Sequence, residues 1–304
     1  MRNPLPRGRW LLLALGLLAF ELSAISSLRA QTANPELDAL LTKGVQFPDG
    51  QFRKLRPPTL ADGLDAAAQQ TAIEAVLAMK KGHPITFAQF VVKNRNTPYV
   101  LLIDSDPQYD TNAPGHSINL WFVVYGELKT VSNPKFMKQE FKPDKSSRID
   151  VLGDDDLKQR QIVPRTTPDG KEWFVHGTFN LLQTDVRVQV QATERVVQTT
   201  TKESTTLAGQ IDRRFDSDAK YPNEWRPAPG GVVGGPPVLY FSSGAYSRVT
   251  KLVKPAGALL VEYHFVYDEP VGWFGGANLL RSKLPQQADQ NVKDFRLDVK
   301  TAEQ

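Results

Sequence analysis

The alternation of apolar and polar residues is clearest near the end of the chain. In the segment 258–270, one face of the expected strand carries Leu259, Val261, Tyr263, Phe265 and Tyr267. Glu262 and His264 fall on the other face. A second apolar segment, 238–253, precedes it across the short connection Lys254 to Gly257, and this spacing is typical of a β-hairpin.

Three further segments have strand patterns. The segment 185–197 alternates strictly, with Val186, Val188, Val190 and Ala192 on one face and Arg187, Gln189, Gln191 and Thr193 on the other. A strand with one buried face and one solvent-exposed face indicates an antiparallel sheet. The segments 117–131 and 172–182 are expected to be strands as well, and 205–215 is expected to pair with 185–197.

Helical periodicity appears at both ends. Near the C-terminus, Pro285 fits a first helical turn, and an apolar stripe follows at Ala288, Val292, Phe295 and Val299. Nearer the N-terminus the pattern predicts a helix at 35–43, a hairpin at 45–55, a helix from Thr59 to Gly82 and strands at 85–92 and 99–103. The fold class expected is therefore α+β: a curled antiparallel sheet packed on a C-terminal helix, with a small N-terminal helical region.

The first thirty residues have the pattern of a secretory signal. Arg2, Arg7 and Arg9 precede an apolar run from Trp10 to Phe20, and small residues follow up to Ala30. We therefore expect a signal peptide at 1–30, a helix-and-strand region at 31–115 and the sheet with its helix at 116–304. The protein is expected to be secreted or periplasmic, without a stable membrane span in the mature chain.

Composition narrows the range of partners. Without the four arginines and one glutamate of residues 1–30, the chain has 33 basic and 32 acidic residues, a net charge of +1. That balance gives no support for nucleic-acid binding. The chain has no cysteine, which excludes disulfides and thiol catalysis and fits a bacterial periplasm or exterior.

No segment carries a catalytic or metal-binding motif, so no catalytic residue, metal or cofactor is predicted. His264 and Glu262 could form a base and its orienting carboxylate, but a solvent-facing pair on a sheet is the simpler interpretation. Asp104 to Gly115 resembles part of a calcium loop, yet Tyr109 and Gly115 stand where such a loop needs Gly and Glu. The run Asp154 to Asp156 is expected to cap a short helix.

The stretch from Tyr267 to Pro285, "YDEPVGWFGGANLLRSKLP", joins the last strand to the last helix. Its glycines match neither a P-loop nor a dinucleotide fingerprint, and a hinge between sheet and helix is the better interpretation. Trp273 and Phe274 are then core residues or residues at a pocket mouth.

The order of these elements resembles that of START-like helix-grip domains. A long first strand, an irregular insertion, several antiparallel strands, a closing hairpin and the final helix extend over residues 116–300. The resemblance implies an apolar cavity between the curled sheet and the last helix. The phrases "PPTLADGLDAAAQQ" and "GWFGGANLLRSKLP" also resemble uncharacterised secreted planctomycete proteins, which suggests a compartment and not an activity.

The leading hypothesis is non-enzymatic binding of an apolar ligand, such as a lipid, between the sheet and the last helix. The residues expected to line or gate the pocket are Trp121, Tyr263, Phe265, Trp273, Phe274, Val292 and Phe295. The alternative is an envelope structural or interaction protein with a filled core, which binds a partner through the exposed face of 187–201. A hydrolase using His264 or Asp104 is a third possibility, although no convergent constellation supports it.

Overall fold

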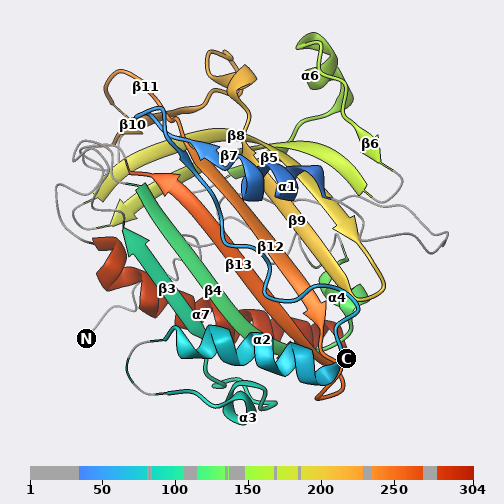
Figure 1. Cartoon of the computed structure of the whole chain (residues 1–304). Coiled ribbons are helices and arrows are strands. Elements are labelled where there is room, and N and C mark those ends of the chain that lie inside the picture. Colours follow the sequence, from blue (N-terminus) through green and yellow to red (C-terminus); the bar gives the residue numbers. More distant parts are fainter. Residues whose placement is uncertain are drawn as a thin grey trace.

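One curled antiparallel sheet organises the chain (Figure 1). The structure is a computed structural model that describes residues 34–80, 82, 84–105, 115–133, 136, 148–167, 170–183, 186–228, 234–269 and 279–304. Within these residues the sheet has 11 strands, and its main path runs β11-β10-β8-β9-β12-β13-β4-β3. The strands β5 and β6 join through β7, which pairs with β8 along its whole length.

The longer strands overlap the predicted segments, although several bounds differ. The strands are β3 (Val100–Ser105), β4 (Gly115–Tyr125), β5 (Arg148–Val151), β6 (Thr166–Thr167), β7 (Gly170–Gln183), β8 (Val186–Thr200), β9 (Ser204–Ile211), β10 (Glu224–Pro227), β11 (Val238–Leu239), β12 (Ser243–Lys251) and β13 (Ala258–Asp268). A separate small hairpin pairs β1 (Val45–Gln46) with β2 (Phe52–Arg53). The predicted hairpins at 45–55 and 238–270 are therefore confirmed.

Helices cover both faces of the sheet. They are α1 (Pro35–Thr42), α2 (Ala66–Ala78), α3 (Phe87–Phe90), α4 (Leu128–Val131), α6 (Asp154–Gln159), the 3-10 turn η1 (Arg213–Phe215) and α7 (Leu279–Ala302). The long helix α7 packs its apolar stripe against one face, with Leu120 and Phe122 of β4 among its neighbours. On the opposite face, α1 packs against β9 and β12, and α2 packs against Val123 and Leu260 (Figure 1). The expected α+β class is confirmed, with a three-layer arrangement.

Several predicted element bounds are wrong. The segment expected as a strand at 85–92 contains the helical turn α3, because Thr86 and Gln89 form a capping box. The helix expected from Thr59 begins only after Asp65, whose side chain accepts a hydrogen bond from the Ala68 amide. The strand expected to reach 131 ends at Tyr125 and is followed by α4, while Pro285 lies inside α7 instead of at its start.

The stretch 54–62, between β2 and α2, crosses the sheet face opposite α7 (Figure 1). The Arg56 carbonyl accepts a hydrogen bond from the Tyr246 hydroxyl at 2.7 Å, and Leu60 is fully buried beneath α2. Asp62 forms an ion pair with Arg248 at 2.6 Å. This segment therefore seals a face that the strand pattern alone would leave exposed.

Within the described part of the chain, none of the helices has both the length and the apolar character needed to cross a bilayer.

Candidate functional site: the cavity between the sheet and α7

A cavity of about 60 Å³ lies between the sheet and α7. Nearly all of its wall is apolar, and the polar side chains that reach it are Gln198, Thr205, Ser247 and Asn291. A cavity needs roughly 10–15 Å³ and several polar partners to hold one buried water. The cavity is therefore large enough for a small apolar group. Its wall offers few hydrogen bonds to a ligand.

Two neighbouring cross-strand rows form the floor of the cavity. The strand registers place Gln198, Leu207, Ser247, Tyr263 and Leu120 in one row, and Thr205, Val249, Val261 and Phe122 in the next. Directly paired residues of adjacent strands point to the same side of a sheet. The polar members come from β8, β9 and β12, whereas β13 and β4 contribute apolar groups and the Tyr263 ring. The cavity consequently has a polar end and an apolar end.

The roof of the cavity belongs to α7, with Val131 of α4 beside it. Val292 is buried, and the Phe295 ring packs edge-on against Phe122 and Phe136 at centroid distances of 5.5 and 5.6 Å. Asn291 is only 8% exposed, and its Nδ2 has no hydrogen-bond partner in the part of the chain that the structure describes. An unpaired buried amide costs about 1–3 kcal/mol. A ligand oxygen at this position would remove that cost.

A buried arginine fixes α7 to the sheet. Arg296 donates through Nε to the Val123 carbonyl at 2.9 Å and through Nη1 to the carbonyls of Thr97 at 2.7 Å and Arg95 at 3.0 Å. Burial lowers its pKa to about 10, which still leaves the guanidinium charged at neutral pH. The helix is therefore held at the level of Phe295, immediately beside the cavity.

The structure brings together three of the residues that the sequence placed at a pocket. Tyr263, Val292 and Phe295 line the cavity. Phe265 lies in the same apolar cluster, 6.3 Å from the Tyr263 ring, without reaching the cavity wall. Trp273 and Phe274 lie outside the described residues. A pocket role for any of these residues stays a prediction.

Trp121 is the exception, because it lies on the opposite face of the sheet from α7. It is buried beneath α2, and its Nε1 donates to Thr59 Oγ1 at 2.9 Å and to Glu262 Oε2 at 3.1 Å. The prediction for Trp121 is wrong because β4 is apolar on both faces, so its alternation does not distinguish Trp121 from its neighbours Leu120 and Phe122.

His264 and Glu262 are not the solvent-facing pair that the sequence predicted, since both are fully buried beside Trp121. His264 Nδ1 lies 2.8 Å from Asn119 Oδ1, while Nε2 lies 3.8 Å from Glu262 Oε2. Burial is the main cause that lowers the pKa of His264, which favours the neutral ring. The Thr59 amide donates to Glu262 at 2.8 Å, so these groups join the sheet to the 54–62 segment.

The polar members of the cavity wall were not predicted from the sequence. Asn291 precedes Val292 in the α7 stripe, and a polar residue beside an apolar stripe was the available signal. Gln198, Thr205 and Ser247 carried no such signal, because their alignment depends on the register between strands that are distant in sequence. No group of three or more acidic or histidine side chains suited to a metal ion occurs among the described residues. Asp104, from the segment that resembles a calcium loop, forms an ion pair with Arg56 at 3.6 Å.

No family model and no curated protein sequence matches the chain. Among solved structures, human STARD10 aligns with a TM-score of 0.33 and 10% identity over 64% of this chain and 72% of that chain. The lipid transfer and protein localization domain of human StarD13 (DLC2) aligns with a TM-score of 0.35 and 10% identity over 71% and 92%. An uncharacterized protein from Rhizobium leguminosarum aligns with a TM-score of 0.31 and 10% identity over 63% and 99%.

Two of these structural neighbours are START-domain proteins, the kind that the order of elements resembles. At such low TM-scores the similarity carries no argument about function. The resemblance to secreted planctomycete proteins stays a prediction.

Proposed function

We propose that this protein is a secreted or periplasmic binding protein that holds an apolar ligand, such as a lipid, between the sheet and α7. The observation that carries the proposal is the cavity itself, which joins an apolar end at β4 and β13 to the unpaired amide of Asn291. Small-molecule sites are typically apolar hollows with a few polar groups that fix orientation. An apolar molecule with one hydrogen-bond acceptor matches this wall.

The size of the cavity determines how a ligand enters. An apolar protein cavity of about 150 Å³ binds benzene, and the cavity here is about 60 Å³. A longer ligand therefore needs α7 to move away from the sheet, or Phe295 to leave its position against Phe122 and Phe136. Arg296 is the main polar attachment that such a movement would strain or break.

Native mass spectrometry of the purified mature protein tests the proposal first. A bound apolar molecule released by organic extraction at a stoichiometric amount would identify the ligand class. The same preparation is then titrated with N-phenyl-1-naphthylamine, an uncharged fluorophore that brightens in apolar surroundings. Saturable binding at one site is expected for the wild-type protein.

A cavity-filling variant locates the site. Val249→Phe places a ring in the cavity floor and should weaken fluorophore binding at least tenfold, at a stability cost of about 1–3 kcal/mol from overpacking. Val253→Phe makes the same change at a residue that is 52% exposed and should leave binding unaltered. A wild-type protein that purifies without ligand and takes up no fluorophore would refute the proposal and favour the filled-core interaction protein.

A further inference from the structure

A second hollow lies on the other face of the sheet, between α1 with its following hairpin and the turn η1. Its volume is about 380 Å³, within the range of roughly 300–1,000 Å³ that is usual for small-molecule sites. Five cationic side chains line it, Lys43, Arg165, Arg195, Arg213 and Arg214, against the two carboxylates Glu172 and Asp212. The lining side chains thus carry three more positive than negative charges, unlike the apolar cavity beneath α7.

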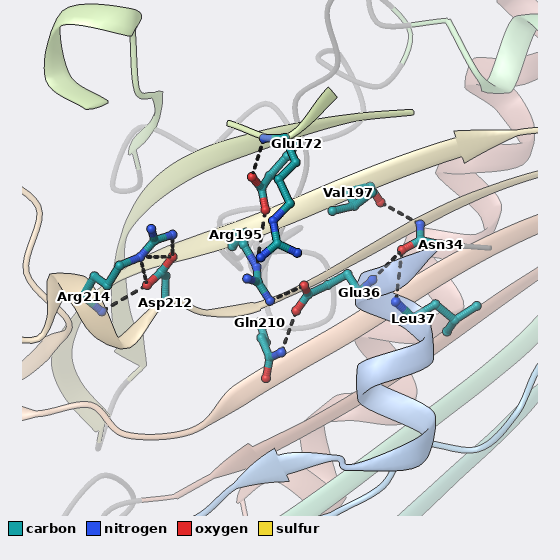
Figure 2. Close-up of polar contacts among 10 residues, drawn as sticks. Asn34, Glu36, Leu37, Glu172, Arg195, Val197, Gln210, Asp212 and Arg214 are labelled. Carbon is teal, nitrogen blue, oxygen red and sulfur yellow. Dashed lines mark hydrogen bonds and ion pairs between the residues drawn. The ribbon is translucent and has the colours of Figure 1, made fainter. Parts of the chain in front are cut away.

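Arg195 lines this hollow, and neighbouring side chains hold it in place (Figure 2). Its Nη2 donates to Glu36 Oε2 at 2.5 Å, and Gln210 donates to the other oxygen of Glu36 at 2.6 Å. Its Nε lies 3.6 Å from Glu172 Oε1. Neither contact involves Nη1, which has no hydrogen bond to the described residues. The oriented guanidinium of Arg195 can therefore donate from Nη1 to a ligand. A guanidinium that is oriented in advance suits an oxyanion.

The turn η1 brings two more guanidinium groups to the same hollow. Arg214 forms a fork with Asp212, at 2.9 Å from Nε to Oδ1 and 2.5 Å from Nη2 to Oδ2 (Figure 2). Arg213 pairs with Asp216 at 2.6 Å, and its guanidinium lies 3.6 Å from the centre of the Phe241 ring. Their side chains are 51% and 41% exposed, which leaves part of each in contact with solvent.

Two cations remain after the ion pairs are assigned. Lys43 and Arg165 have no carboxylate partner among the described residues, and the Lys43 ammonium lies 5.1 Å from the centre of the Phe52 ring. Even when Glu36 and Asp216 are counted, one positive charge remains in excess. Phe52 and Phe241 also line the hollow, which adds apolar surface beside the cations.

We propose that this hollow binds a small organic anion whose phosphate or carboxylate group meets Arg195 and Lys43. The body of the anion packs against Phe52 and Phe241. Burial raises the pKa of Glu36, while the hydrogen bonds that Arg195 and Gln210 donate to its carboxylate act in the opposite direction. The site is separate from the apolar cavity, and neither proposal depends on the other.

Isothermal titration of the full mature chain with inorganic phosphate and with citrate, at constant ionic strength, tests this site. Saturable binding of at least one anion is expected. Arg195→Gln should raise the Kd of the protein for that anion at least tenfold, because removing a charge-assisted hydrogen bond costs about 1.5–3 kcal/mol. That variant also deprives the buried Glu36 of its partner, so Lys43→Gln provides a second test. Lys43 makes no described ion pair, and the variant should fold normally and raise the Kd about threefold.

The matched control is Arg148→Gln, since Arg148 pairs with Asp150 on β5 and does not line the hollow. Its Kd should equal that of the wild type. A parallel titration uses phosphatidylglycerol vesicles. Three results would overturn the proposal: no saturable binding of either anion, an equal loss of affinity in the control variant, or binding to the vesicles alone. The last result would assign the charge to a membrane headgroup and not to a free small molecule.

Discussion

The buried carboxyl of Glu194 should make the protein less stable as pH rises. Glu194 lies on β8 between Val175 of β7 and Ile211 of β9, and it is only 3% exposed. Among the described residues, the side chain that donates to it is Ser243, at 3.4 Å, which is long for a hydrogen bond. Burial raises its pKa from 4.5 to about 8. The protonated form is therefore the one that the fold accommodates.

The sign and size of the effect follow from proton linkage. Between pH 4.5 and 8 the folded chain keeps a proton on Glu194 that the unfolded chain has lost, so the stability from this group falls as pH rises. Each pKa unit corresponds to about 1.4 kcal/mol, and the gap between 4.5 and about 8 therefore corresponds to about 5 kcal/mol. Roughly 4 kcal/mol of it should be lost between pH 5 and pH 8.5.

Glu194→Gln removes the charge and keeps the shape of the side chain. Urea unfolding followed by tryptophan fluorescence should show the variant about 4 kcal/mol more stable than the wild type at pH 8.5 and within about 1 kcal/mol of it at pH 5. The exposed Glu74 on α2 offers the control Glu74→Gln, which should follow the wild type at both pH values. Burial also raises the pKa of Asp268 to about 7. Its contribution to the pH dependence is the same in all three proteins and cancels in the comparison. Parallel pH profiles for Glu194→Gln and the wild type would refute the reasoning.

Three further substitutions have defined outcomes. Trp121→Phe removes a donor to the buried Glu262 and should lower the free energy of unfolding by about 2–3 kcal/mol, while fluorophore binding beneath α7 stays unchanged. Arg296→Met keeps the aliphatic stem but loses three hydrogen bonds to carbonyls, so we expect a loss of about 3 kcal/mol and faster amide hydrogen exchange in α7. Asn34→Ala removes the α1 cap, in which the side chain accepts from two amides, and should cost about 1–2 kcal/mol in urea unfolding.

Each of these outcomes has a contrary result. Loss of fluorophore binding in a folded Trp121→Phe protein would mean that the two faces of the sheet are coupled. Unchanged exchange in α7 after Arg296→Met would show that apolar packing alone holds the helix. For the cap, Asn34→Ser keeps a side-chain acceptor but, like Asn34→Ala, lacks the Nδ2 that donates to the Val197 carbonyl at 3.0 Å. It should be about 1 kcal/mol more stable than Asn34→Ala, and equal losses in both variants would refute capping as the cause.

The local pattern of the sequence determined which side chains share a face. The alternation from Leu259 to Tyr267 placed Tyr263 correctly, and the helical stripe placed Val292 and Phe295 on the buried side of α7. These assignments succeed because the periods of strand and helix are properties of the backbone, independent of what lies opposite. The hairpin at 238–270 was predictable for the same reason, since its turn and both strands are adjacent in sequence.

Only the tertiary structure decided what covers each face. Glu262 and His264 alternate as an exposed pair would, yet the 54–62 segment, about two hundred residues earlier, lies over them and hydrogen-bonds to Glu262 at 2.8 Å. The cavity beneath α7 and the cationic hollow on the other face likewise combine residues from strands and helices that are far apart in the chain. A periodic pattern records which side of its own backbone a residue occupies. The partner on that side is set by long-range packing, which no local pattern contains.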